Sequence, residues 1–165
     1  MTKGIFAVSE FFDDYLKKLD TIIKRSGHAV QMTGQEDGLP FMYTIGRAEK
    51  GLDEFIMFGA LPPAIMRSII NGICSEFDQA GHRAEHGEIF SNEGQRFRID
   101  LAAGADQTHM NFARARLELI GKSASFDPFQ IVWPDTQGRF PDDEGYETKF
   151  VQPLYMRENP PKHNS

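Results

Sequence analysis

The chain has 165 residues, a formal net charge of -6 and an apolar fraction of 40%, which is the size and composition of one ordinary globular domain. Net acidity argues against nucleic acid as a partner, because such binding depends on neutralising phosphates with Lys and Arg. No apolar run approaches the roughly 20 residues of a membrane span, and no leader pattern is present. We therefore expect a cytoplasmic protein without a membrane partner.

The first elements are indicated by apolar spacing and turn residues. A three-to-four spacing of apolar residues predicts a helix that begins near Ser9, a candidate N-cap, and ends at Gly27. Short strands at 29–32 and 41–45, joined by a turn through 35–38, predict an antiparallel hairpin.

The next segment predicts a buried strand and a second helix. Residues 54–59 are nearly all apolar, which is typical of a strand in the middle of a sheet. Pro62 and Pro63 fit the first turn of a helix whose continuous apolar stripe runs from Ile65 to Phe77, and Gly81 ends it.

The second half of the chain has weaker signals. Strands are expected at 89–90 and 97–101, a third helix at about 109–120, and a buried strand at 129–132. Together these elements predict a single α+β domain over residues 1–157, in which amphipathic helices pack on a mixed, mostly antiparallel sheet. Residues 158–165 read as a flexible tail.

Four short motifs occur in a distinctive order: Tyr43-Thr44-Ile45-Gly46, Asp53-Glu54-Phe55, Gln130-x-Val132-Trp133-Pro134-Asp135-x-x-Gly138-x-Phe140-Pro141 and Gln152-Pro153. Their joint order and spacing resemble a bacterial family catalogued as domain of unknown function 4262. The chain differs where the family often has proline before the glutamate and leucine after the glycine, since Asp53 and Arg47 stand at these positions. The resemblance implies an α+β domain and brings no established reaction with it.

Polar residues near predicted strand ends form the candidate ligand-binding set: Tyr43, Thr44, Glu54, Gln130, Trp133, Asp135 and Gln152. Convergent polar groups beside an aromatic wall are what a ligand pocket requires. The alternative is structural: Asp135 and Gly138 fit the first and fourth positions of a type I turn, and we favour that role for Asp135. For Glu54 and Tyr43 the two interpretations are evenly balanced, because an acidic group before an apolar strand needs a partner.

Two further constellations have a structural explanation that we favour. His82 and His86 would share a helix face in zinc-ligand spacing, but Gly81 and Gly87 bracket them. A third ligand would have to come from elsewhere, with His109 and Asp100 as candidates, so the two histidines are weak metal candidates. Trp-Pro-Asp is similar to the acid loop of protein tyrosine phosphatases, yet the only cysteine, Cys74, falls on the apolar stripe of the second helix and is expected to be a core thiol.

Basic residues on the predicted helices are interpreted as solvated faces rather than a nucleic-acid patch. They are Lys17, Lys18, Lys24 and Arg25 on the first helix and Arg114 and Arg116 on the third.

These observations lead to three hypotheses. The first is a non-catalytic binding or adaptor module that captures a protein or a small ligand without a cofactor, with bacterial or phage conflict as a candidate setting and a homo-oligomer left open. The second is a small hydrolase or lyase that uses Glu54 or Asp135 as base and Tyr43 as acid. The third is a metal-dependent enzyme at His82 and His86.

Overall fold

The computed structural model describes residues 2–34, 39–102 and 108–155, and it does not describe the side chains of residues 2–9 and 108. The predicted turn at 35–38 and the predicted tail at 158–165 lie outside the described residues.

The described chain forms three α-helices, two short 3-10 turns and six strands. In order they are α1 (Thr2–Ser26), β1 (Ala29–Thr33), β2 (Phe41–Ile45), η1 (Ala48–Lys50), β3 (Phe55–Phe58), α2 (Pro63–Ala80), β4 (Glu88–Asn92), β5 (Gln95–Leu101), η2 (Thr108–Met110), α3 (Asn111–Leu119) and β6 (Phe129–Val132). The strands form one sheet in the order β1-β2-β3-β6-β5-β4. All neighbours pair antiparallel except β3 and β6, which are parallel. The predicted α+β fold with a mixed, mostly antiparallel sheet is confirmed.

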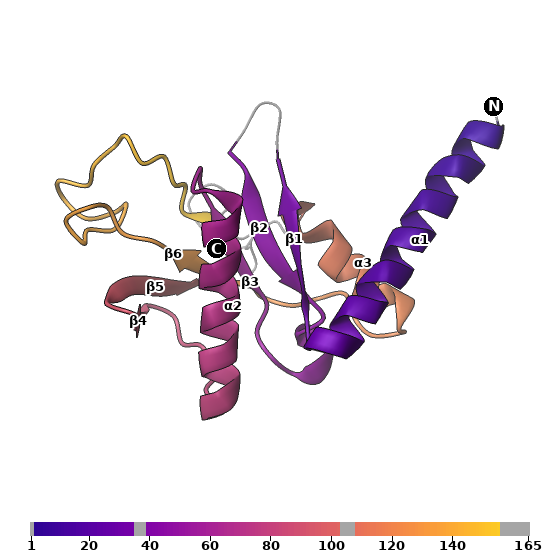
Figure 1. Cartoon of the computed structure of the whole chain (residues 1–165), viewed down its shortest axis with the longest axis horizontal. Helices are drawn as coiled ribbons and strands as arrows, with labels where there is room; N and C mark the ends of the chain where they lie inside the picture. Colours follow the sequence, from indigo (N-terminus) through magenta and orange to yellow (C-terminus); the bar gives the residue numbers. More distant parts are fainter. Residues whose placement is uncertain (1, 35–38, 103–107, 156–165) are drawn as a thin grey trace, which may run out of the picture.

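The sheet is covered on both faces (Figure 1). Because successive strand residues point to opposite faces, Met42 of β2 packs in the core beneath α2, together with Ile70 of that helix. Its neighbour Tyr43 packs in the other core, where α1 contributes Leu19 and α3 contributes Ala113. The domain therefore has three layers, with α2 on one face of the sheet and α1 and α3 on the other.

Local sequence signals correctly predicted the elements in the middle of the chain. The structure confirms α2 between the two prolines and Gly81, which adopts a left-handed conformation at the helix end. It also confirms the central position of β3, whose four residues are all buried. One correction concerns the stripe on α2, because the Ile65 side chain is 49% exposed rather than part of the core.

The first helix begins earlier than the sequence signals suggested. It starts at Thr2, so Ser9 lies inside it and is not its N-cap. A serine can occupy a helix interior at little cost, and nothing near Ser9 breaks the helical pattern. A residue type that is common at N-caps was therefore not enough to predict where the helix begins.

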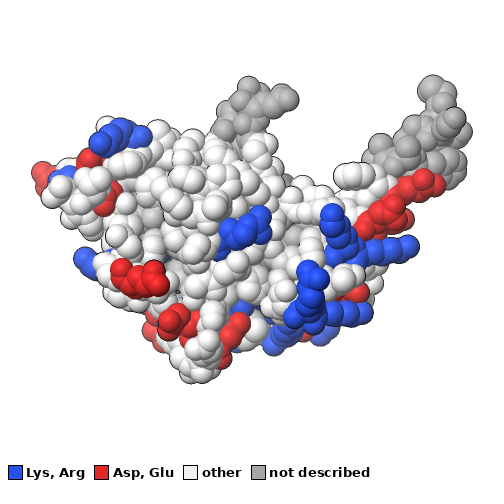
Figure 2. Space-filling view, viewed as in Figure 1, with Lys and Arg blue, Asp and Glu red and all other residues white. Residues whose placement is uncertain are grey.

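Charge is unevenly distributed over the surface. Lys and Arg side chains gather over α1, whereas the middle of the same view, where α2 lies, is largely uncharged (Figure 2). Lys17, Lys18, Lys24 and Arg25 are exposed, as expected of a solvated face. Arg116 is a correction, because its side chain is only 5% exposed and is paired with carboxylates of α1 and η1. No described helix is both long enough and apolar enough to cross a bilayer.

Candidate functional site

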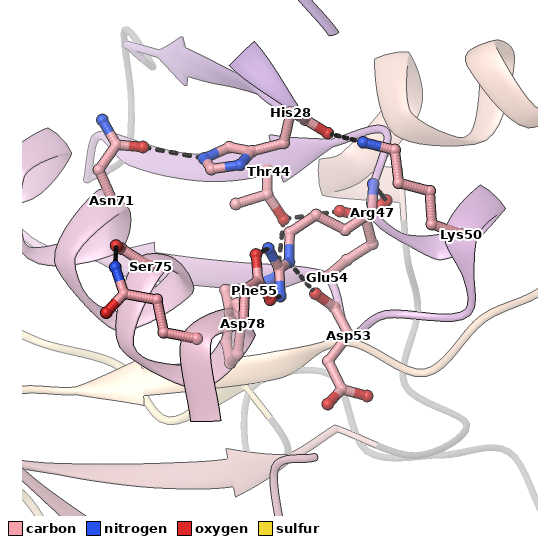
Figure 3. A network of polar contacts seen from close by, with 12 residues as sticks. His28, Thr44, Arg47, Lys50, Asp53, Glu54, Phe55, Asn71, Ser75 and Asp78 are labelled. Atoms are coloured by element: carbon pink, nitrogen blue, oxygen red, sulfur yellow. Dashed lines mark hydrogen bonds and ion pairs between the residues drawn. The ribbon is translucent and has the colours of Figure 1, made fainter. Parts of the chain in front are cut away.

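The Glu54 carboxylate is buried between the end of β2 and the start of β3 (Figure 3). The Thr44 hydroxyl donates to its Oε1 at 2.7 Å, and the Thr44 oxygen accepts the N–H of Phe55 at 2.8 Å. The backbone N–H groups of Arg47 and Ala48 donate to Oε2 of Glu54 at 3.1 and 2.9 Å. The first N–H groups of a helical turn have no partner inside the turn, so Glu54 provides one for η1. Two of the sequence candidates, Thr44 and Glu54, are thus brought together.

Burial raises the pKa of Glu54 to about 7, while the N–H of Ala48, the hydroxyl of Thr44 and the charge of Arg47 act in the opposite direction. A carboxyl that titrates near neutrality has the property that the enzyme hypothesis requires of its base. Both oxygens of this carboxyl, however, already accept hydrogen bonds from the protein. The arrangement holds a turn in place.

Arg47 connects this turn to α2. Its side chain is 3% exposed, and it donates two parallel hydrogen bonds of 2.9 Å to the carboxylate of Asp78 on α2. Its Nε donates to the carbonyl of Asp53 at 2.6 Å, and its guanidinium lies 5.5 Å from the ring centre of Phe55. Sequence reasoning missed this role, because the partner on α2 is distant in the chain.

Tyr43 makes its polar contact elsewhere. Its hydroxyl accepts the N–H of Phe112 at 3.2 Å in the core formed with α1 and α3, and burial raises its pKa. The acid and base of the enzyme hypothesis, Tyr43 and Glu54, therefore form hydrogen bonds with different parts of the protein.

Gln130, Trp133 and Gln152 form a separate group that fixes the segment after β6. The Gln152 side chain accepts the N–H of Trp133 and donates to its carbonyl, both at 2.8 Å. The Gln130 side chain donates to the carbonyl of Pro153 at 2.8 Å and accepts the N–H of Tyr155 at 2.7 Å. Each amide replaces a missing strand partner, so the two glutamines attach the C-terminal segment to the sheet.

Asp135 sits in a turn, and all its oxygens are occupied. Its Oδ1 accepts the N–H groups of Gln137 and Arg139 at 2.9 Å, and its Oδ2 accepts the N–H of Glu147 and the Nε–H of Arg139 at 3.0 Å. Gly138 donates to the Asp135 carbonyl at 3.1 Å, which closes the expected turn. Burial opposes the ionised form, yet the hydrogen bonds from Arg139, Glu147 and Gln137 lower the pKa of Asp135 to about 2.

The two histidines do not share a helix face, because α2 ends at Ala80. His82 Nε2 lies 2.8 Å from a carboxylate oxygen of Glu88, and His86 Nδ1 accepts the N–H of Leu101 at 3.0 Å. Within the described ranges, no group of three His, Cys, Asp or Glu side chains is arranged to hold a metal ion.

Cys74 is the core thiol that the apolar stripe predicted. It is 1% exposed on α2, and burial raises its pKa to about 12. A thiol in this state is a poor nucleophile.

A cavity of about 330 Å³ lies against β5 and β6 and is lined by charged side chains. Arg98 donates two hydrogen bonds of 2.9 Å to Asp100 and one of 2.6 Å to Asp142. Gln130, one of the sequence candidates, also lines this cavity, although its amide is already bonded to the C-terminal segment. Among the described residues, the one arginine of this cavity is thus paired with two carboxylates of the protein itself.

A second cavity, of about 260 Å³, adjoins Glu54, and its charged side chains are also bonded to other groups of the protein. Arg83 pairs with Asp53 through contacts of 2.9 and 3.2 Å, and Lys122 donates to the carbonyl of Glu49 at 3.3 Å. The polar groups of both cavities are therefore largely used by the fold itself.

A groove of about 310 Å³ differs from these two cavities. It lies between the N-terminal half of α2, the β4–β5 hairpin and the end of β6, and its apolar walls are Leu61, Ile65, Ile69, Phe97, Trp133 and Pro134. Its polar side chains are Ser68, Asn92, Glu93 and Gln95. In the part of the chain that the structure describes, none of these four side chains has a hydrogen bond or an ion pair within the protein. We call this site the α2–hairpin groove.

Trp133 forms a fixed wall of the α2–hairpin groove. Its indole N–H donates to the carbonyl of Phe58 at 2.8 Å, and the Phe150 ring packs edge-on with its centre 5.9 Å away. Gly59 has a φ of +123°, and a Cβ at this position would lie 2.6 Å from the indole ring. The ring thus cannot turn without breaking a buried hydrogen bond, so this wall of the groove is fixed by the fold.

The structure is an α+β domain with a largely apolar groove beside its sheet. The family model described as Domain of unknown function (DUF4262) matches residues 22–147, and the chain belongs to this family. The matched range includes every residue that lines the groove. Comparison with curated proteins gives no significant match, and comparison with solved structures gives none either.

Only Trp133 of the sequence candidates lines the groove. The other residues of the site were missed, since their meeting depends on how α2 packs against the hairpin. One signal existed in the sequence: the apolar residues of α2 cover a wider angle than the sheet beneath can bury, which leaves Ile65 at the surface.

Proposed function

We propose that this domain is a non-catalytic binding module that captures a small ligand with an apolar body in the α2–hairpin groove. The observation that supports this proposal is the contrast between cavities. Polar side chains are paired within the protein at the other two sites, whereas those of the groove are available to a ligand. Few polar groups beside a preformed apolar wall are the usual features of a small-molecule site.

Size and burial are consistent with such a ligand. The volume of about 310 Å³ lies at the lower end of the roughly 300–1,000 Å³ that is typical of small-molecule pockets. Covering the half-exposed Ile65 side chain alone would contribute roughly 1 kcal/mol to binding. Since Trp133 is already fixed, little conformational entropy is lost when the ligand binds.

A cytoplasmic, bacterial setting is part of the proposal. A chain with one cysteine cannot form an internal disulfide, which fits the cytoplasm. The resemblance to a bacterial family supports the bacterial setting. In that setting the module would bind and hold its ligand, while any chemistry would belong to another protein.

The proposal is tested with 2-phenylethanol, a neutral aromatic probe, because Trp133 is the only tryptophan and its fluorescence reports on the groove. Ile65→Glu places a charge on an apolar wall at an exposed site in the first turn of α2, where an acidic residue suits the helix dipole. We expect saturable binding to the wild type and at least roughly tenfold weaker binding to Ile65→Glu, the ratio that about 1.4 kcal/mol produces.

Leu119→Glu is the matched control, since Leu119 is 57% exposed on α3, on the opposite side of the sheet. This variant should bind the probe as the wild type does. Equal binding by Ile65→Glu and the wild type, or no saturable binding to the wild type, would contradict the proposal.

A further inference from the structure

The turn between β4 and β5 has an unusual residue at its first position. Glu93 and Gly94 form a two-residue loop between the paired residues Asn92 and Gln95, and their φ angles are +52° and +83°. Two positive φ angles define the type I′ hairpin turn, which favours Asn, Asp or Gly at both positions. Among the described residues, Glu93 is the only one other than glycine with a positive φ.

This conformation lowers the stability of the domain, because a side chain in the left-handed region approaches its own backbone. Asparagine at this position would avoid most of that cost. A strained residue at the edge of a cavity is a reason to ask what its side chain does there.

Of the residues that the structure describes, Glu93 provides the only charge that lines the α2–hairpin groove. Within the described chain its carboxylate has no cationic partner, in contrast to the carboxylates of Asp53 and Asp100, which pair with arginines. Its neighbours Asn92 and Gln95 add side-chain amides, whose oxygens can accept further hydrogen bonds. Glu93 is exposed, so a cation beside it would form a solvent-accessible ion pair of modest strength.

We infer that the α2–hairpin groove selects small amines, in which a protonated nitrogen meets Glu93 while an aromatic or aliphatic body packs against Trp133 and Ile65. This inference rests on the proposed function and specifies its ligand. An ammonium group has three N–H donors and no acceptor, so it matches a carboxylate flanked by amide oxygens. A carboxylate of similar shape would be repelled by Glu93, since both carry negative charge.

The test uses three probes that share one phenylethyl body: 2-phenylethylamine is cationic, 2-phenylethanol is neutral and 3-phenylpropionate is anionic. We expect the wild type to bind the amine roughly three- to fivefold more tightly than the alcohol, the ratio that a solvent-accessible ion pair supports. The propionate should bind most weakly. The preference for the amine should decrease as salt is added, because salt screens the ion pair.

Glu93→Asn removes the charge and also suits the turn, so loss of folding cannot explain its result. We expect this variant to bind the amine and the alcohol with equal affinity and to unfold at a higher temperature than the wild type. Glu118→Gln, which removes an exposed carboxylate from α3, should keep the preference for the amine.

The outcomes separate the two proposals. If the wild type binds amine and alcohol equally, or Glu93→Asn retains the preference, the inference about amines is wrong while the groove remains a binding site. If no probe binds in a manner that depends on Ile65, the proposed function is wrong as well.

Discussion

The carboxylate of Glu54 gives the stability of this domain a dependence on pH. Its folded-state pKa is about 7, against an ordinary value of 4.5, so the folded protein holds this proton more tightly than the unfolded chain does. Stability from this group is then full below the ordinary value and is lost as the pH rises through about 7. We expect the free energy of unfolding to decrease between about pH 5 and about pH 8, by on the order of 3 kcal/mol for this group.

Urea unfolding at several pH values measures this decrease. Glu54→Gln cannot ionise, so its free energy of unfolding should depend less on pH across the same range, although the variant keeps only one acceptor oxygen for the donors Thr44, Arg47 and Ala48. Glu118→Gln should follow the wild-type curve. A Glu54→Gln curve parallel to that of the wild type would show that this carboxyl titrates normally.

Gly59 is the residue that lets the indole of Trp133 lie against the backbone. In Gly59→Ala, the new Cβ would come 2.6 Å from the ring, so the ring must move and its hydrogen bond to Phe58 must lengthen. We expect a loss of roughly 1–3 kcal/mol of stability, a changed tryptophan emission spectrum and weaker binding of 2-phenylethanol.

Gly121→Ala is the control for backbone strain alone. Gly121 also has a positive φ, +76°, but a Cβ there would meet no atom within 4 Å. Its effect on stability should be smaller, and its emission spectrum should match that of the wild type. If both alanine variants behave alike, contact with Trp133 is not what requires glycine at position 59.

At the scale of elements, Arg116 joins three segments that are distant in the sequence. From α3 it donates to both oxygens of Glu49 in η1, at 2.9 and 3.0 Å, and it also pairs with Asp20 of α1. Arg116→Met keeps an unbranched side chain but removes the guanidinium, so both carboxylates lose this partner. We expect the free energy of unfolding of this variant to be about 2 kcal/mol lower than that of the wild type, because removing the arginine leaves partly buried carboxylates without their cation.

Adding Glu49→Gln to Arg116→Met tests that explanation. The double variant removes one of the unpaired charges, so it should recover part of the lost stability in the same chemical unfolding assay. Glu49→Gln alone provides the comparison. If it lowers the free energy of unfolding by the same amount in the Arg116→Met background as in the wild type, the two side chains are not coupled.

Sequence information was sufficient for elements whose limits are set locally. Two prolines and a glycine define α2, and an unbroken apolar run defines β3, so both were predicted where the structure has them. The start of α1 was not predicted, because serine is a capping residue that is also tolerated inside helices. Boundaries that depend on a single residue type are therefore the least certain.

For the whole molecule, the fold class was predictable and the site was not. Antiparallel pairing of β2 and β3 brings Thr44 to Glu54, which the sequence suggested by placing both near strand ends. Ile65 and Glu93 line one groove only because α2 crosses the end of the hairpin, and periodicity carries no information about such a crossing. Arg116 also depends on long-range packing: its sequence position indicated a solvated cation, but the structure buries it.

The parallel contact between β3 and β6 divides the sheet into two antiparallel halves, β1-β2-β3 and β6-β5-β4. The strands within each half are consecutive along the chain, whereas the contact between the halves must wait until the whole segment from residue 59 to residue 128 has been brought into a closed loop. Closing a loop of that length costs entropy before its hydrogen bonds repay it. This junction, where Gln130 of β6 pairs with Ile56 of β3, is consequently where we expect the rate-limiting step of folding to occur.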